Sequence, residues 1–340
     1  SGEVGVAIAT SGPGATNLVT GIATAQMDSS PLVCITGQVP TKLIGYDAFQ
    51  ETDISGITLP ITKHSYLVTR VDDIMPTIKE AFHLAKSGRP GPVLVDITKD
   101  VQQTSAEWVW SDAPVKMRGY HAHRLPATSD MTKAIELIGA ARKPLILAGQ
   151  GVIQSNAMKE LRAFAELADA PVAVTLLGIG GFPASHPLNI GMMGMHGEAW
   201  VNHAIQEADL LLAFGMRFDD RVTGNLKTYA LNAKKIHIDI DPSEINKNVT
   251  ADAAIVADLR QALKDLPDHA RPGRLGQRRQ LAQRVARIGR RARQDHAHQN
   301  GPLLADRQFR AFEFSQLRVP SHKRDTSASP SQSAGIVPAP

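Results

Sequence analysis

The sequence is poor in cysteine, in aromatic side chains and in long apolar runs. Its single cysteine, Cys34, excludes an internal disulfide framework. Cys34 lies in the apolar run of residues 32–35, which favours a small buried thiol over a nucleophile. Aromatic residues make up 5% of the chain, and no stretch approaches the roughly 18 consecutive apolar residues that a membrane-spanning helix needs. We therefore expect no disulfide scaffold and no membrane contact.

The start of the chain also lacks features. It has no initiating Met and no signal or transit segment. Residues 4–10 already have the apolar, β-branched character of a buried parallel strand. We therefore expect a fragment that begins inside a domain, so the missing presequence leaves two compartments open: the cytoplasm of a bacterium or an organelle of a eukaryote.

Positive charge is scarce except at the C-terminal end. Residues 1–270 hold 23 Lys and Arg against 29 Asp and Glu, a net charge of −6. Residues 271–340 hold 14 basic and 4 acidic residues, a net charge of +10. The basic end has no continuous apolar stripe and becomes rich in Ser, Pro, Ala and Gly, which predicts disorder. The overall charge of +4 therefore says nothing about the folded part.

Strands and helices alternate in two series, which predicts an α/β fold. In the first series, helical spacing begins at Ala15, and Ile78, Ala81, Phe82 and Ala85 share one helix face. The expected strands are residues 4–10, 32–36, 66–71 and 92–97. In the second series, the expected strands are residues 145–148, 171–175, 210–214, 236–240 and 253–256. The helices of that series are expected at residues 130–141, 156–168, 198–207 and 258–266.

This alternation is typical of doubly wound parallel sheets with helices on both faces. We therefore predict two such domains in tandem. The first occupies residues 1–104, a linker occupies residues 105–126, and the second domain occupies residues 127–268. Residues 269–340 form the predicted disordered basic tail.

A glycine turn joins the first expected strand to the first helix. Gly12, Pro13 and Gly14 lie in it, and glycine lets the backbone turn sharply and lets a ligand come close. The following helix N-terminus offers unpaired N–H groups. Taken alone, the turn is at least as compatible with a purely structural role.

Longer motifs are more specific. The stretch VAIATSGPGATNLVTGIATAQMDSSPLVCITGQV (residues 6–39) resembles the pyrimidine-binding domain of thiamine-diphosphate enzymes. GYDAFQETDISGIT (residues 45–58) and SGRPGPVLVDITKDV (residues 87–101) narrow the resemblance to acetolactate synthase large subunits. Together with motifs of the second domain, the resemblance extends to about residue 268. The loop at residues 45–58 favours this family over glyoxylate carboligase, which remains an alternative.

The resemblance implies an activity and a set of residues. The family decarboxylates pyruvate and joins the remaining unit to a second 2-oxo acid, such as 2-oxobutyrate, in branched-chain amino acid synthesis. Thiamine diphosphate carries the chemistry, while the protein orients and desolvates the reactants. By position, Gly12, Pro13 and Gly14 would line the pyrimidine, and Gln50 would reach the thiazolium. Phe49 and Lys99 would border the substrate pocket and channel. Without the resemblance, Phe49 reads as core, Lys99 as a solvated cation and Gln50 as a loop hydrogen bond.

Polar and glycine residues follow every expected strand of the second domain, where doubly wound sheets bind ligands. Arg217 and Arg221 can neutralise a pyrophosphate, and Asp239 can accept hydrogen bonds from ribose hydroxyls or adenine. The methionines of residues 192–197 suit a flavin ring, with His196 as a polar contact. The bland alternatives are core packing for the methionines and a surface ion-pair loop for residues 217–221.

The resemblance implies that the ligand is FAD, in a mainly structural role. The turn at residues 148–151 is not a G-x-G-x-x-G fingerprint, so NAD binding is not supported. The residues expected to contact FAD come from both domains and are Arg89, Gly149, Gln150, Gly151, Thr175, Leu176, Met193, Gly194, Met195, His196, Gly215, Arg217, Asp219, Arg221, Val222, Asp239, Ile240 and Asp258.

Two family features are missing from these 340 residues. One is the glutamate that activates the pyrimidine, upstream of the glycine turn; the other is the domain that holds Mg²⁺ and the diphosphate. We therefore predict no metal site and no unaided catalysis, and a non-catalytic FAD-binding or dimerising fragment is the second alternative. The family implies a homodimer and often a small regulatory subunit. The tail resembles a shifted reading frame more than a nucleic-acid-binding segment, because it lacks a folded module.

Overall fold

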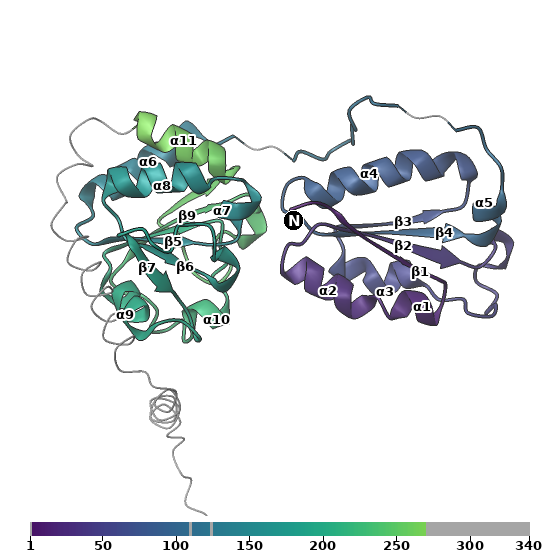
Figure 1. Ribbon diagram of the computed structural model, residues 1–340, viewed down its shortest axis with the longest axis horizontal. Coiled ribbons are helices and arrows are strands. Elements are labelled where there is room, and N and C mark those ends of the chain that lie inside the picture. Colours follow the sequence, from purple (N-terminus) through teal and green to yellow (C-terminus); the bar gives the residue numbers. More distant parts are fainter. Residues whose placement is uncertain (1, 109–110, 123–124, 270–340) are drawn as a thin grey trace, which may run out of the picture. The chain divides into compact units, whose positions relative to one another are not determined.

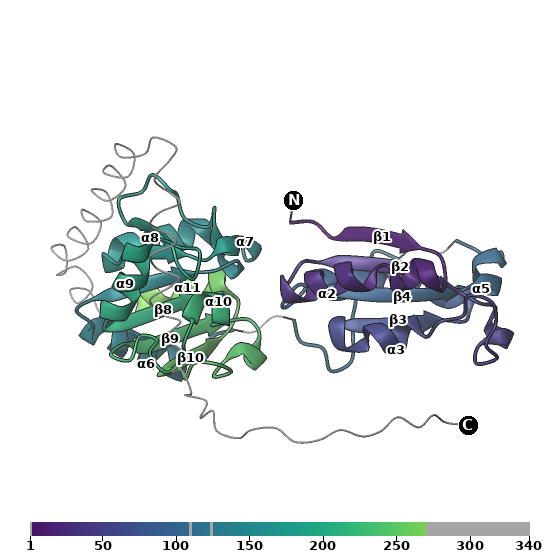
Figure 2. The same cartoon turned by 90° about the horizontal axis from the view of Figure 1, so that it is seen from below.

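The first sheet has four parallel strands. The computed structural model describes residues 2–108, 111–122 and 125–269 (Figure 1). The predicted tail, apart from its first residue, lies outside this part of the chain. The strands run in the order β1-β2-β4-β3, which Figure 2 displays edge to edge. Their bounds are Gly5–Ala9 for β1, Leu32–Gln38 for β2, His64–Val68 for β3 and Pro92–Thr98 for β4.

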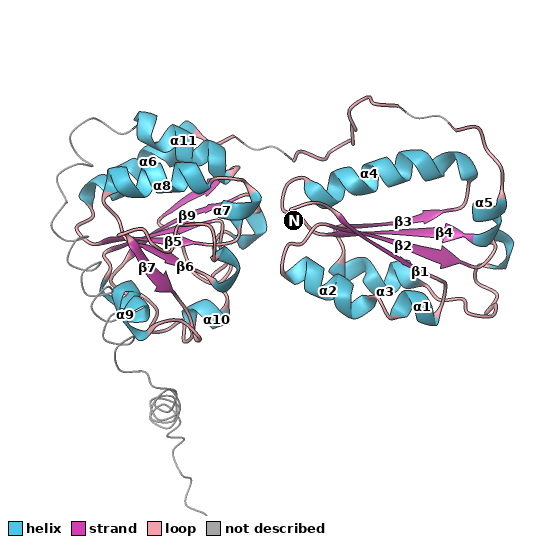
Figure 3. Ribbon diagram, viewed as in Figure 1, coloured by secondary structure: helices cyan, strands magenta, loops and turns pink. Residues whose placement is uncertain are grey.

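Helices cover both faces of this sheet, as Figure 3 shows by colour. One face carries α4 (Ile74–Lys86), and the other carries α1 (Pro13–Thr16), α2 (Val19–Met27) and α3 (Ile54–Thr58). The short α5 (Lys99–Gln103) follows β4. The inner strand β4 is buried along its whole length, which suits its apolar, β-branched sequence. Cys34 lies in β2 and is 1% exposed, and burial raises its pKa to about 11.

Several expectations for this half were wrong in detail. β1 is not buried: Val6 and Ile8 are 51% and 76% exposed, because β1 is the edge strand of the described sheet. The helix expected from Ala15 is two helices, α1 and α2, and the third strand starts two residues earlier than expected. Phe82 is 38% exposed, whereas Leu84, two residues further along and so on the opposite side of α4, is buried.

The second sheet has six parallel strands in the order β10-β9-β8-β5-β6-β7. Both sheets fall within one compact unit of the chain. From β5 the chain moves outward through β6 and β7, then returns to the other side of β5 and moves outward again. The bounds are β5 (Pro144–Ala148), β6 (Val172–Val174), β7 (Asn189–Met192), β8 (Leu210–Phe214), β9 (Lys234–Asp239) and β10 (Ala253–Val256).

Two apolar cores sandwich this sheet. In Figure 1 one face carries α6 (Thr128–Ala140), α8 (Met158–Ala168) and α11 (Leu259–His269), and the other carries α9 (Ala199–Glu207) and α10 (Asp220–Thr223). The helix α7 (Gly151–Gln154) follows β5 directly. Alternate residues of β8 enter the two cores, with Leu212 and Phe214 on one side and Leu211 and Ala213 on the other. The predicted class, two parallel-sheet α/β domains, is confirmed.

The strand β7 and the short helices α3, α7 and α10 were not predicted from the sequence. The β7 strand has four residues and includes Gly191 at φ +112°, so it shows no strand periodicity. Its last residue, Met192, belongs to the stretch that we assigned to flavin contact. Among the described residues, no helix is long and apolar enough to cross a membrane.

The centre of the second domain should be sensitive to cavity formation. Phe214 is 0% exposed and packs edge to face on Phe164, with ring centroids 5.7 Å apart. Phe214→Ala should lower the free energy of unfolding by about 3–5 kcal/mol. Urea unfolding followed by circular dichroism measures this change. Phe49→Ala is the matched control, because Phe49 is 88% exposed and its loss should cost under about 0.5 kcal/mol. Equal midpoints for the two variants would contradict the described core.

Candidate functional site

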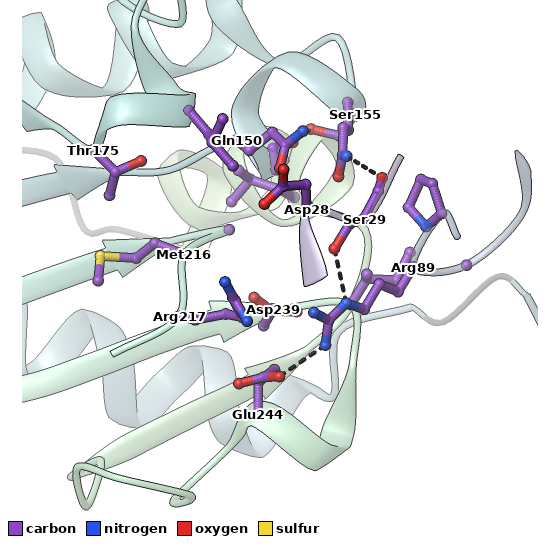
Figure 4. Close-up of a pocket in the computed structure, with 18 of the residues that line it drawn as sticks. Asp28, Ser29, Arg89, Gln150, Ser155, Thr175, Met216, Arg217, Asp239 and Glu244 are labelled. Atoms are coloured by element: carbon purple, nitrogen blue, oxygen red, sulfur yellow. Dashed lines mark hydrogen bonds and ion pairs between the residues drawn. The ribbon is translucent and has the colours of Figure 1, made fainter. Parts of the chain in front are cut away.

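The strand order of the second sheet reverses between β5 and β8. Ligands of doubly wound sheets bind beyond the carboxyl ends of the strands at such a point. A cavity of about 530 Å³ lies there, within the range of roughly 300–1,000 Å³ for small-molecule sites. Residues that follow β5, β6, β8, β9 and β10 all line it. Figure 4 draws Gln150, Thr175, Met216, Arg217 and Asp239 around this cavity.

Most of the residues predicted to contact FAD line this cavity. They are Arg89, Gln150, Gly151, Thr175, Leu176, Gly215, Arg217, Asp219, Arg221, Val222, Asp239, Ile240 and Asp258. Gly149, Met193, Gly194, Met195 and His196 do not line it. Met193 is 3% exposed in an apolar core, whereas Met195 is 58% exposed. The bland reading of the methionines as core therefore describes Met193.

Close backbone contacts between glycines lie at the cavity. A Cβ atom on Gly151 would lie 2.6 Å from the Cα atom of Gly215, and one on Gly149 would lie 2.3 Å from the Gly215 carbonyl oxygen. Gly215 also has φ +56°, a conformation that favours glycine. The turns that follow β5 and β8 thus touch backbone to backbone. These glycines are needed for that contact, whether or not a ligand also approaches them.

Arg217 is the most enclosed cation that the second domain brings to the cavity. Its side chain is 28% exposed, against 69% for Arg221. The Arg217 Nη2 atom lies 3.7 Å from Asp219 Oδ2. Asp219 in turn is the N-cap residue of α10, and its Oδ1 atom accepts a hydrogen bond from the Val222 amide at 3.1 Å. The cavity therefore has a partly desolvated guanidinium that is suited to an anionic group.

Asp239 supplies a buried carboxylate at the end of β9. It is 9% exposed, and its Oδ1 atom accepts a hydrogen bond from the Asp241 amide at 2.9 Å. Burial raises the pKa of Asp239 to about 6, against the lowering effect of that hydrogen bond and of Arg89. The group is thus ionised at neutral pH but close to titration, and it can accept hydrogen bonds from a ligand hydroxyl.

Arg89 is already engaged by protein groups. Its Nη1 atom donates to Glu244 Oε1 at 2.7 Å and to Asp241 Oδ2 at 3.0 Å, and its Nε atom donates to the Ser29 hydroxyl at 2.9 Å. Figure 4 shows the bonds to Glu244 and Ser29. Burial lowers the pKa of Arg89, but the two carboxylates raise it further, so the net direction is upward. Arg89 of the first domain thus donates hydrogen bonds to Asp241 and Glu244 of the second domain as well as to Ser29.

Sequence reasoning missed several residues that line the cavity. Glu244 follows the acidic end of β9 in D-P-S-E, so the rule that ligands meet strand ends could have found it. Asp28 and Ser29 come from the other sheet, and no pattern near them signals this position. Gln154 also lines the cavity, and its Nε2 atom donates to the Ser29 carbonyl oxygen at 2.8 Å.

The glycine turn of the first domain lies against Gln50. Gly12 has φ +58°, and a Cβ atom there would lie 2.7 Å from the Gln50 carbonyl oxygen. Gln50 itself has φ +59°, which is unusual for a residue with a side chain. The structure thus brings together two of the residues predicted to line thiamine diphosphate, although 38 positions separate them in the chain. Pro13 is exposed beside them, and a Cβ atom on Gly14 would lie 2.6 Å from Thr10 Cγ2.

A carboxylate shapes the loop that carries Phe49 and Gln50. Glu51 accepts hydrogen bonds from the amides of Gly45 and Ala48, and these bonds lower its pKa. The closed loop presents Phe49 outward, 88% exposed, which overturns its alternative reading as core. Lys99 is exposed at the start of α5, as a solvated cation would be.

A buried polar network supports the same loop from inside. Asp96 is 1% exposed and accepts hydrogen bonds from the Thr36 hydroxyl at 2.7 Å and from Gln38 Nε2 at 2.9 Å. Gln38 Nε2 also donates to the Thr52 carbonyl oxygen at 2.8 Å, two residues after Gln50. Burial raises the pKa of Asp96 to about 6. The sequence motif V-D-I-T gave no hint of this network.

A metal site is not found in the described part of the chain. No group of three or more His, Cys, Asp or Glu residues there could hold an ion. The described residues offer a nucleotide-sized cavity with a guanidinium and a buried carboxylate, together with a separate glycine turn next to Gln50.

Comparison with known proteins agrees with this architecture. Residues 131–266 match the model of the thiamine pyrophosphate enzyme central domain, and residues 1–57 match that of the N-terminal TPP binding domain. The chain is 54% identical over 266 residues to an acetolactate synthase large subunit of Corynebacterium glutamicum, covering 78% of this chain and 42% of the relative. It is 53% identical over 268 residues to the chloroplastic acetolactate synthase 1 of Zea mays, with the same coverages.

A third relative matches a stretch of similar length. The probable acetolactate synthase large subunit of Methanocaldococcus jannaschii is 52% identical over 268 residues, which are 78% of this chain and 45% of the relative. The chain thus spans less than half the length of these relatives. The resemblance carried by the glycine turn and by residues 45–58 is confirmed, since the chain belongs to the thiamine pyrophosphate enzyme family and its relatives there are acetolactate synthases.

Proposed function

We propose that the chain is part of an acetolactate synthase large subunit whose second domain binds FAD. The observation that carries the proposal is the cavity at the reversal of the second sheet, where five strand ends meet around Arg217 and Asp239. The relatives support the activity: decarboxylation of pyruvate and its condensation with a second 2-oxo acid such as 2-oxobutyrate. We assign residues 1–104 to the pyrimidine-binding domain, residues 105–126 to the linker and residues 127–268 to the FAD domain.

The side chains of the cavity suit the parts of FAD. Arg217, aided by the more exposed Arg221, would neutralise the pyrophosphate. Asp239 would accept hydrogen bonds from ribose hydroxyls, as acidic strand ends do in dinucleotide folds. Bound FAD would act mainly as a structural group here. Gly149, Met193, Gly194, Met195 and His196 stay predicted contacts that lie outside the cavity.

Thiamine diphosphate would meet the first domain at the glycine turn. Gly12, Pro13, Gly14 and Gln50 are the residues proposed to line its pyrimidine and thiazolium rings. Phe49 and Lys99, both exposed, would border the substrate pocket and channel. The protein groups here would orient the cofactor and exclude water from it. Mg²⁺ and the diphosphate would be held by residues that these 340 do not include.

The same proposal covers partners and location. A second large subunit would complete the active site, and a small regulatory subunit is a further expected partner. The relatives include bacterial and chloroplastic proteins, so we propose the cytoplasm for a bacterial source and an organelle for a eukaryotic one. The alternatives remain a non-catalytic FAD-binding or dimerising fragment and glyoxylate carboligase activity.

Arg217 tests the flavin proposal most directly. Arg217→Gln should weaken FAD binding by roughly tenfold or more, because a charge-assisted contact to the pyrophosphate is lost. Titration of the flavin-free chain with FAD, followed by quenching of flavin fluorescence, gives the dissociation constant. Arg162→Gln is the matched control, since Arg162 lies on α8 and does not line the cavity. Unchanged affinity for Arg217→Gln, or no binding by the unmodified chain, would reject the proposed contact.

FAD affinity should also decrease as the pH is lowered. The pKa of Asp239 is about 6 in the unliganded protein, and only the ionised carboxylate accepts hydrogen bonds at both oxygens. Binding therefore favours the deprotonated form, so affinity should be full near pH 7.5 and decrease up to about tenfold per pH unit below 6. The same titration at pH 7.5, 6 and 5 measures this. Asp239→Asn should bind more weakly at pH 7.5 and lose this pH dependence; a parallel slope in both proteins would refute the role.

A polypeptide of these 340 residues should form no acetolactate by itself. The reason is that it spans less than half the length of its relatives, and the family resemblance implies an activating glutamate and a segment for Mg²⁺ and the diphosphate outside the part that it shares with them. The test supplies pyruvate with thiamine diphosphate, Mg²⁺ and FAD and assays acetolactate colorimetrically. A flavin absorption band without pyruvate consumption would favour the non-catalytic FAD-binding alternative. Sustained acetolactate production would disprove the expectation.

A further inference from the structure

The turn after β8 is held at three of its carbonyl groups. The Gly215 carbonyl accepts a hydrogen bond from the Gly151 amide at 2.9 Å. The Met216 carbonyl pairs with His237 Nε2 at 2.9 Å, and the Phe218 carbonyl accepts from Asn248 Nδ2 at 2.9 Å. Arg217 lies between two of these fixed carbonyls. The backbone that carries the proposed pyrophosphate contact is thus clamped on both sides.

His237 is the buried member of this clamp. It is 0% exposed on β9, and its ring packs edge to face on Phe218, with centroids 5.2 Å apart. It does not line the cavity. Its Nε2 atom also lies 3.9 Å from Asp239 Oδ2, which is beyond hydrogen-bond distance, so the hydrogen bond of His237 to a residue at the cavity is the one to the Met216 carbonyl.

The protonation state of His237 follows from its surroundings. A carbonyl oxygen only accepts hydrogen bonds, so Nε2 must carry the proton. Nδ1 is buried and has no hydrogen-bond partner in the described part of the chain. Burial lowers the pKa of His237, although the Met216 carbonyl and Glu244 oppose this. The ring is therefore a neutral donor with its proton on one fixed nitrogen.

We propose that His237 is a positioning residue for the flavin site, which holds the Met216 carbonyl and so directs the Arg217 guanidinium toward the pyrophosphate. This inference rests on the proposed FAD function. A rival explanation is that His237 only fills the core, in which case its loss would weaken every property of the domain without passing through Arg217.

A double-mutant cycle separates the two explanations. His237→Leu and Arg217→Gln are made singly and together in the full 340-residue chain, and the FAD dissociation constant is measured for each. If His237 acts through Arg217, His237→Leu alone should weaken binding roughly fivefold to tenfold, and adding it to Arg217→Gln should change little. Full additivity of the two losses, or no loss in His237→Leu, would overturn the proposal.

Two further variants guard against unfolding. His237→Gln places an amide nitrogen near the position of Nε2 and should restore most of the FAD affinity, which a lost hydrogen bond predicts and lost core volume does not. His203→Leu changes an exposed histidine of α9 and should bind FAD normally. Failure of His237→Gln to recover affinity, with its thermal midpoint unchanged, would count against the clamp.

The clamp can also be judged without flavin. Nitrogen-15 NMR of the His237 ring in the unliganded chain at pH 7 should report a neutral ring with the proton on Nε2. A proton on Nδ1, or a charged ring, would overturn the proposal whatever FAD does. If the ring is as expected but the chain binds no FAD, the proposed function fails while the clamp on the turn stands.

Discussion

Backbone contact between Gly151 and Gly215 is the constraint on which the candidate site depends. Parallel strands bring all their carboxyl ends to one edge of a sheet, but a cavity forms only where the connections leave in opposite directions. β5 and β8 are the neighbours at that point, and the turns after them come close enough to exclude any Cβ atom at three positions. The site is therefore set by the sheet order first and by side chains second.

Two carboxylates are similarly buried but differ in their hydrogen-bond donors. Asp96 and Asp239 both have a pKa raised to about 6 by burial. Asp96 has side-chain donors on both oxygens and does not line the cavity, whereas Asp239 has one backbone donor and lines the cavity. A satisfied carboxylate supports the local structure, and a carboxylate with spare acceptor capacity is suited to a ligand.

Much of the fold was predictable because each domain repeats one pattern. Apolar runs such as residues 92–97 and 210–214 predicted the inner strands within about one or two residues. Strand ends then gave most of the cavity lining, since in a parallel sheet they must lie together. β7 was not predictable, because four residues with a glycine have no period.

The features that were not predicted depend on contacts between segments that are far apart in the sequence. Arg89 was expected at a ligand but binds Asp241 and Glu244, partners that lie about 150 positions away in the chain. The exposure of Val6 and Ile8 depends on which strand lies beside β1, and the strand's own letters do not encode that. The same limit explains His237: its role depends on a carbonyl group, which has no signature in sequence.

Cys34 has a practical consequence. It is the chain's only sulfhydryl, and it lies in an inner strand with its ionisation moved to about pH 11. Thiolate is the form that reacts with maleimides and iodoacetamides, so the native residue should remain silent toward such reagents at neutral pH. A cysteine introduced on any exposed loop would then carry a fluorophore or spin label alone. Two such cysteines, one in each domain, would allow the distance between the two sheets to be measured without removing Cys34.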